Sequence, residues 1–131
     1  MLQDSHAFSG FSVDDFDVAR KFYGEVLGLK VTDEPGMGFH VNFGNGGEHF
    51  VYPKADHQPA TYTVLNFPVP DIDEAVDALA AKGVVFEQYD MDQLKTDEKG
   101  IARPPKPEYG PPIAWFKDPA GNILSVLQAA K

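Results

Sequence analysis

The chain has 131 residues, no cysteine and a formal net charge of −9 at pH 7. This length is typical of one domain with its own hydrophobic core, and the lack of cysteine excludes disulfides, thiolate metal ligands and a cysteine nucleophile. The acidic charge argues against a nucleic-acid partner, because phosphate contacts need Lys and Arg, but it is compatible with a cationic ligand or simply with solubility.

At the N-terminus, residues 1–8 lack a basic segment followed by a long apolar run, so we expect no signal peptide, no membrane span and a cytoplasmic location. Residues 6–13 alternate in polarity and predict a strand, with Phe8, Gly10 and Ser12 on one face. Asp15 is the predicted N-cap of a helix that runs to about Leu27 and ends at Gly28. Its predicted buried face consists of Ala19, Phe22, Val26 and Leu27.

A short strand at residues 29–32 comes next, and strands at 39–43 and 48–52 are predicted to form a hairpin across the glycine-rich turn 44–47. Residues 54–59 are a polar connector. The second half then repeats the pattern with a strand at 61–69, a helix capped by Asp71 and ended by Gly83, and a strand at 84–87. The last hairpin joins strands 113–116 and 123–127 through the turn 118–121, where Asp118 is expected to form a turn hydrogen bond without any role in chemistry.

Residues 88–112 interrupt this second half. They are rich in proline, which lacks an N–H and fixes φ, so we predict a long loop. Loops of this length are usually functional or mobile, and a dimer-contact or disordered loop is an equal alternative.

The chain contains an internal repeat, in which residues 11–19 match residues 67–75 at one constant offset. The identical pairs are Phe11/Phe67, Val13/Val69, Asp15/Asp71, Asp17/Asp73 and Ala19/Ala75. Repeats of this kind indicate similar structural units. We therefore predict an α+β fold in a single domain, 1–131, with one βαβββ module at about 5–53 and a second at about 60–128. The two would pair into a curved mixed sheet of eight strands with helices outside and a central cleft.

Three segments resemble signatures of the vicinal oxygen chelate superfamily, which includes glyoxalase I, extradiol dioxygenases and bleomycin-resistance proteins. They are residues 11–29, residues 69–83 and residues 115–124, where the last reads WFKDPAGNIL. The resemblance covers nearly the whole chain except 88–112. It implies the paired-module fold and a homodimer.

The resemblance also implies where a metal centre would lie. The metal-dependent members bind a divalent cation with His, Gln or Glu on four strands of the cleft, and the corresponding positions here are Phe8, Val64, Ser125 and, to within one residue, Val51. Phe and Val have no donor atom and a serine hydroxyl is a poor ligand, so we predict no metal and no cofactor.

Strand alternation gives a candidate set of cleft residues. We predict ligand contacts at Phe8, Ser12, His49, Tyr62, Asn66, Trp115 and Ser125. The alternative for most of them is that they close the cleft as a second core, and Trp115 could equally pack in the core or stack on a ligand. His40 and His49 could together form an off-pattern metal or acid–base pair, or lie apart on the hairpin surface. His6 and His57 are expected in solvent.

These observations leave three hypotheses for function, and no catalytic residue is assigned. The first is a bleomycin-resistance-like protein that binds a small organic molecule in the cleft without a metal. The second is a glyoxalase-like lyase or isomerase that uses an off-pattern metal or none. The third is a non-catalytic accessory module whose partner contacts residues 88–112.

Overall fold

The computed structural model describes residues 1–129 and divides the chain into two compact units, Met1–Pro59 and a second that begins at Ala60. The division lies at the end of the predicted connector. Within the described residues, no helix has both the length and the apolar character needed to cross a membrane.

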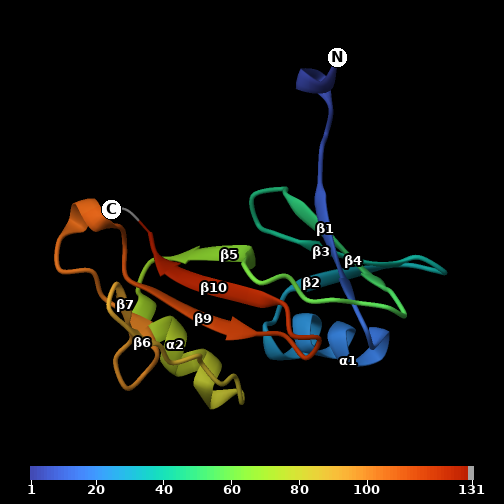
Figure 1. Cartoon of the computed structure of the whole chain (residues 1–131). Helices are drawn as coiled ribbons and strands as arrows, with labels where there is room; N and C mark the ends of the chain where they lie inside the picture. The colour runs from blue at the N-terminus through green and yellow to red at the C-terminus, as the bar shows by residue number, and fades with distance from the viewer. Residues whose placement is uncertain (130–131) are drawn as a thin grey trace. The chain divides into compact units, whose positions relative to one another are not determined.

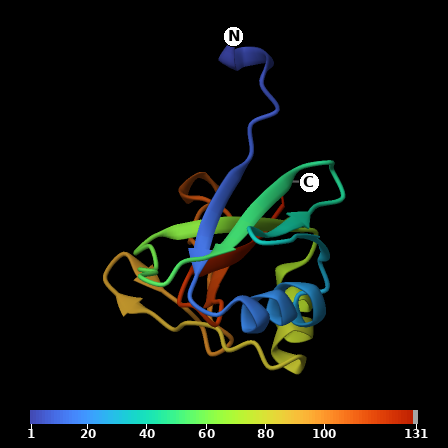
Figure 2. The ribbon, with the colours of Figure 1, turned by 90° about the vertical axis from the view of Figure 1, so that its right-hand side faces the viewer.

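Unit 1 is a four-stranded mixed sheet in the order β1 (Ser9–Val13), β4 (Glu48–Pro53), β3 (Gly38–Asn42) and β2 (Lys30–Glu34). β1 runs parallel to β4, and the other neighbours are antiparallel. β1 is shorter than predicted, because residues 6–8 precede it without pairing; Figure 2 shows this segment and the short helix η1 (Leu2–Asp4) extending beyond the sheet.

The helix of unit 1 begins where the sequence predicts. Asp15 accepts a hydrogen bond from the Val18 N–H at 3.1 Å, which satisfies one of the unpaired donors of the first turn of α1 (Phe16–Lys21). The helix continues as a π-helical turn, η2 (Phe22–Val26), and Gly28 follows with φ 70°. The predicted buried face is only partly right, since Ala19 is buried but the largest buried side chain is Tyr23, which the prediction omitted.

Unit 2 repeats this arrangement with β5 (Thr63–Val69), β10 (Ile123–Gln128), β9 (Ile113–Lys117) and β8 (Ile101–Ala102) in that order. β5 is parallel to β10, and β10 is antiparallel to β9, as β1, β4 and β3 are in unit 1. Figure 1 shows α2 (Ile72–Ala81) lying along one face of this sheet. Asp71 caps α2 by accepting from the Glu74 N–H at 3.1 Å, so the internal repeat is present in the three-dimensional structure.

The two units differ at the fourth strand. The predicted strand 84–87 forms one isolated bridge, Phe86 with Phe116, and β8 pairs with Ile113 and Ala114 of β9. The segment 88–112, predicted as a long loop, contains short elements: a hairpin of β6 (Asp90–Met91) and β7 (Leu94–Lys95), then β8, then the helical turn η3 (Pro107–Tyr109). We call residues 88–112 the insertion.

The turn between β9 and β10 is held by Asp118, which is buried. Its carboxylate accepts from the backbone N–H groups of Ala120 and Asn122, at 2.9 and 2.8 Å, and from the Asn122 side-chain amide at 3.0 Å. These bonds confirm the predicted structural task of this turn.

Candidate functional site

The helix of unit 1 covers one face of its sheet, and His49 lies on that face. The rings of Phe11 and Tyr23 have centroids 5.8 Å apart, so Phe11 faces the helix. Phe11 pairs with Val51, and Val51 and His49 are two residues apart on β4, so all three share a face. His49 is only 5% exposed and its ring lies 4.7 Å from that of Phe11. His49 therefore does share a face with Val51, as predicted, but this face packs against the helix, so the expected direction of His49 into a cleft is wrong.

His40 lies on the opposite face from His49. Val41 is the residue paired with His49, and His40 precedes it on β3, so alternation sends the His40 side chain the other way. The two imidazoles therefore do not form the off-pattern pair that the sequence left open. On β4 the residue opposite His40 is Phe50, and the ring centroids of the two are 4.9 Å apart.

Burial lowers the pKa of His49, because the charged imidazolium is poorly solvated there. Its Nδ1 lies 2.6 Å from the Ser9 hydroxyl, and within residues 1–129 its Nε2 has no hydrogen-bond partner. Above the ordinary histidine pKa of 6.5 the ring is neutral in both the folded and unfolded states. Below it the unfolded chain takes up a proton that the folded protein does not, so the free energy of unfolding falls as the pH falls.

We therefore expect the free energy of unfolding to decrease by up to about 1.4 kcal/mol per pH unit below about pH 6.5 through His49 alone. Denaturant titrations of the wild type and His49→Leu at about pH 7.5 and about pH 5 measure this contribution. The variant should lose less stability between the two pH values than the wild type. Equal losses would contradict the account.

On the face of the unit 1 sheet opposite α1, His40 lies near two carboxylates. Nε2 of His40 lies 2.6 Å from a Glu34 carboxylate oxygen, and Nδ1 lies 3.4 Å from Glu48. Phe8 makes edge contacts with the rings of His40 and Phe50 but is 58% exposed. This face therefore brings one histidine between two carboxylates, beside aromatic rings.

Ser12 lies on the same face of β1 as Gly10, and its hydroxyl is 2.6 Å from Nδ1 of His57. Both side chains are partly buried. His57 was expected in solvent, and this expectation is wrong, because the connector folds back so that His57 reaches the sheet.

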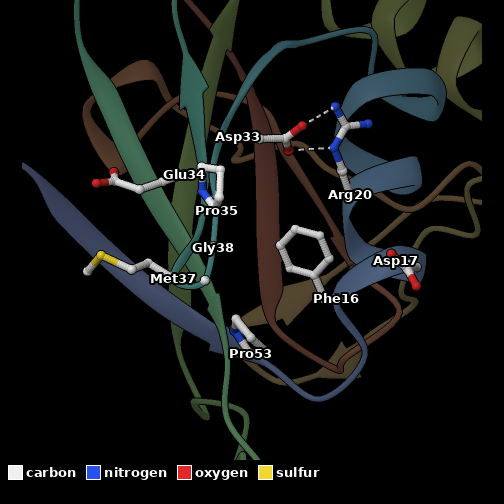
Figure 3. A pocket seen from close by; sticks show the side chains of 10 residues that line it. Phe16, Asp17, Arg20, Asp33, Glu34, Pro35, Met37, Gly38 and Pro53 are labelled. Atoms are coloured by element: carbon white, nitrogen blue, oxygen red, sulfur yellow. Dashed lines mark hydrogen bonds and ion pairs between the residues drawn. The ribbon is translucent and has the colours of Figure 1, made fainter.

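A hollow of about 610 Å³ lies on unit 1 beside α1, at the turn between β2 and β3 (Figure 3). Its floor includes Phe16 and Met37, and its one cation, Arg20, donates two hydrogen bonds to Asp33 at 2.6 and 2.9 Å. This pair raises the pKa of Arg20 and lowers that of Asp33. Because the guanidinium is already occupied by Asp33, the hollow offers little for recognition of an anion.

In unit 2 the sheet brings three of the predicted site residues together. Ser125 pairs with Asn66 on β5 and with Trp115 on β9, so the three share a face. The Ser125 hydroxyl donates to the Asn66 side-chain oxygen at 2.6 Å and is fully buried. The neighbouring residues Ala114 and Phe116 are buried in the core on the other face, so Trp115 does not belong to that core.

The remaining predicted ligand contact of unit 2, Tyr62, and the position that corresponds to a metal ligand, Val64, are placed differently. Tyr62 precedes β5 and is 70% exposed. The register of β5 and β10 shifts between Ile123 and Leu124, so Val64 has no direct partner, and alternation along the strand does not fix its direction.

The insertion forms a groove of about 1030 Å³ over the face of unit 2 that holds Trp115. Its floor is Trp115 with Ala102, Ile113 and Leu127, of which Ile113 pairs with both of the others across the sheet. Its walls come from the insertion, namely residues 92–95, 103–105 and 109–111. We call this hollow the Trp115 groove. Tyr89 supports the indole from the side, with ring centroids 5.7 Å apart and planes at 78°.

Comparison with known proteins identifies the family of this chain. The sequence profile described as "Glyoxalase/Bleomycin resistance protein/Dioxygenase superfamily" matches residues 5–126. The chain belongs to this superfamily. No curated protein matches its sequence. The predicted resemblance is confirmed, and so is the α+β fold class.

Solved structures of this superfamily's fold cover nearly the whole chain. A superfamily member from Sphaerobacter thermophilus has a TM-score of 0.69 at 23% identity, covering 96% of this chain and 98% of its own. A lactoylglutathione lyase from Agrobacterium tumefaciens has a TM-score of 0.66 at 22% identity, and the match covers 93% of this chain and 92% of the lyase. TnmS3, an antibiotic binding protein from Streptomyces sp. CB03234, has a TM-score of 0.61 at 21% identity, and the match covers 95% of this chain and 96% of TnmS3. At these identities the likeness shows the fold alone.

The residues at the superfamily's metal positions do not fit a metal ion. Phe8 and Val64 have no donor atom, and the Ser125 hydroxyl donates to Asn66. On β4 the residue facing away from the helix is Phe50 and not Val51, and it has no donor atom either. Within residues 1–129 no three His, Asp or Glu side chains are grouped so that they could hold a metal ion.

Sequence reasoning found Trp115 but missed the groove around it. The walls lie in the insertion, whose many prolines suggested only an irregular loop. A usable signal was present, since the buried apolar pair Ile101–Ala102 interrupts an otherwise polar and proline-rich segment.

Proposed function

We propose that this protein binds a small organic molecule with a flat ring in the Trp115 groove, without a metal centre of the superfamily type. The observation that carries the proposal is the half-buried indole on the floor of a groove with largely apolar lining. Binding sites for small molecules are typically concave, mainly apolar and about 300–1,000 Å³ in volume. The groove, at about 1030 Å³, is slightly larger than the upper end of that range.

The shape and chemistry of the lining favour a flat ligand. An indole face stacks on planar rings, and several prolines of the insertion give the walls few conformations. The polar groups lie in the walls: Asp92, Gln93 and Lys95 in the β6–β7 hairpin, and Arg103 and Tyr109 further along the insertion. They would orient a polar substituent rather than supply most of the binding energy.

Two of the similar structures illustrate the range of functions on this fold, since one is described as an antibiotic binding protein and one as a lactoylglutathione lyase. The antibiotic binding protein is a precedent for a protein of this fold whose description names binding of a small molecule and no reaction. In keeping with the sequence, we also propose a homodimer in the cytoplasm, with no nucleic-acid partner and no cofactor.

Titration with flat aromatic probes tests the proposal. Trp115 is the only tryptophan, so quenching of its fluorescence reports the groove directly. A panel of neutral, cationic and anionic naphthalene derivatives should include compounds that quench it saturably, with Kd of about 1–100 μM, or roughly −5.5 to −8 kcal/mol. Absence of saturable quenching across the panel would overturn the proposal.

A second candidate function, a lyase or isomerase, is favoured by one observation: His40 is held at 2.6 Å from Glu34 on the face opposite α1. A histidine oriented by a carboxylate is suited to moving protons. Turnover of the hemithioacetal of methylglyoxal and glutathione, reduced at least about 100-fold by His40→Gln, would establish it. A rate unaffected by His40→Gln would exclude His40 as the acid–base group.

A further inference from the structure

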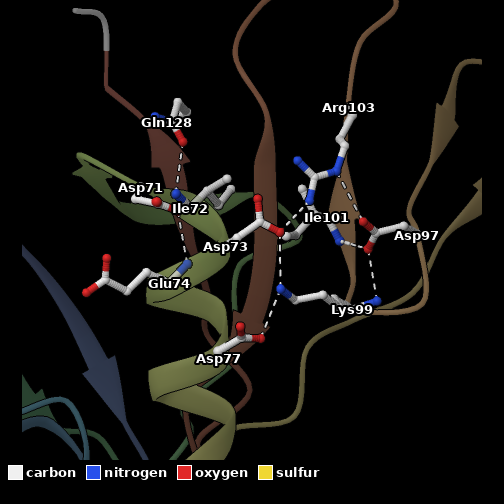
Figure 4. A network of polar contacts seen from close by, with 10 residues as sticks. All are labelled: Asp71, Ile72, Asp73, Glu74, Asp77, Asp97, Lys99, Ile101, Arg103 and Gln128. Carbon is white, nitrogen blue, oxygen red and sulfur yellow. Dashed lines mark hydrogen bonds and ion pairs between the residues drawn. The ribbon is translucent and has the colours of Figure 1, made fainter.

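One wall of the Trp115 groove is attached to helix α2 by a network of charges (Figure 4). Arg103 donates to the Asp73 carboxylate at 2.6 Å and to Asp97 at 3.2 Å. Lys99 lies 3.1 Å from the same Asp73 oxygen and 2.9 Å from Asp77. Asp73 is therefore shared by Arg103 and Lys99, two of the four cations of the insertion, and these hydrogen bonds lower its pKa.

The segment that carries these cations is itself a tight turn. Asp97 Oδ1 accepts from the backbone N–H groups of Lys99 and Ile101, both at 2.9 Å. Gly100 has φ 89°, and a Cβ atom on it would lie 2.7 Å from the Phe86 Cβ. Ile101 is 1% exposed and pairs with Ala114 in the sheet. The turn thus holds Lys99 and Arg103 in a defined position next to α2.

Arg103 belongs to both features, since it lies in the charge network and also lines the groove. The chain runs from Arg103 directly into Pro104 and Pro105, which form the wall. β8 pairs with β9 over only two residues. Along the chain after β8, the Arg103–Asp73 contact is the next connection between this wall and the rest of unit 2. Loss of that contact would free the wall to move away from Trp115.

We infer that Asp73 is a positioning residue of the Trp115 groove, which holds the Arg103–Pro105 wall over the indole through Arg103 and so makes ligand affinity sensitive to ionic strength. This inference rests on the proposed function. The partners are partly exposed, and single exposed ion pairs contribute little, but one carboxylate shared by two cations forms a network. Salt screens such a network, which accounts for the expected dependence.

The test compares Asp73→Asn with Asp77→Asn as the matched control, because within residues 1–129 Asp77 forms an ion pair with Lys99 and none with Arg103. The probe is N-phenyl-1-naphthylamine, which is neutral and therefore indifferent to the charge that both variants remove. Asp73→Asn should weaken its binding about 5-fold and Asp77→Asn less than about 2-fold. Raising NaCl from about 0.02 M to about 0.5 M should weaken binding to the wild type and leave Asp73→Asn nearly unchanged. A purely structural role would lower Tm in both variants without this difference in salt dependence.

Hydrogen exchange supplies a second readout that needs no ligand. The amides of Tyr109 and Gly110 in the far wall are hydrogen-bonded within η3, and those of Lys99 and Ile101 within the turn. Asp73→Asn should speed exchange in both sets, and Asp77→Asn should not. Unchanged exchange and unchanged Kd in Asp73→Asn, with the wild type still quenched by the probe, would overturn this inference and leave the proposed function standing. A wild type that shows no quenching, together with faster exchange in Asp73→Asn, would overturn the proposed function and keep the role of Asp73 in holding the wall.

Discussion

Replacing Gly38 with alanine is expected to lower the free energy of unfolding by about 3 kcal/mol, the upper end of the cost of overpacking. A Cβ atom at this position would lie 2.2 Å from the Val51 carbonyl oxygen and 3.0 Å from the Tyr52 Cα. Both are backbone atoms of β4, so no side-chain rotation relieves the clash and β3 must separate from β4. Denaturant unfolding followed by circular dichroism measures the effect.

Gly36→Ala is the matched control for this prediction. Gly36 lies two residues earlier in the turn between β2 and β3, with φ 81°, and a Cβ atom there would meet nothing within 4 Å. Its cost should be only the conformational one, about 1 kcal/mol. Similar losses in the two variants would show that the close approach of β3 and β4 at Gly38 is not as described.

Trp115→Leu should weaken the binding of N-phenyl-1-naphthylamine at least about 30-fold, because truncation of a central tryptophan in a binding site typically costs 2 kcal/mol or more. The indole is the largest part of the floor of the groove and is supported from the side by Tyr89. Trp115→Phe keeps an aromatic face and should lose only a few-fold. The fluorescence of the probe itself follows these titrations, since the variants lack tryptophan.

Tyr62→Leu serves as the control for Trp115→Leu. Tyr62 was predicted as a ligand contact from strand alternation, but it is 70% exposed and does not line the groove. The Tyr62→Leu variant should bind the probe with the same Kd as the wild type. Equal losses in Tyr62→Leu and Trp115→Leu would place the ligand outside the groove.

The fold could be predicted in detail where local chemistry determines it. Asp15 and Asp71 cap their helices as expected, because a carboxylate just before an apolar helical pattern can accept a hydrogen bond from an unpaired N–H of the first turn. The repeat of residues 11–19 at 67–75 predicted the similarity of the two units, because the matching cap and apolar residues favour the same strand–helix geometry. The fourth strand of unit 2 was harder, because a two-residue strand such as β8 leaves no periodic pattern.

The site could be predicted only in part, because a shift of one residue in a strand reverses its faces. His49 was assigned to the wrong face for this reason, and the adjacent Phe50 takes the position that faces away from α1. Trp115, Asn66 and Ser125 were predicted together and do share a face. The contact of Ser12 with His57 depends on how the connector folds back, which no pattern in residues 54–59 reveals.

Native mass spectrometry of protein purified without added metal or chelator tests the central claim most directly, since one spectrum reports oligomer, metal and retained small molecules. Our account predicts a metal-free dimer, with any organic adduct that is present in the wild type absent from Trp115→Leu. A stoichiometric divalent metal ion would contradict our interpretation of Phe8, Phe50, Val64 and Ser125, and an adduct retained by Trp115→Leu would contradict the location of the site.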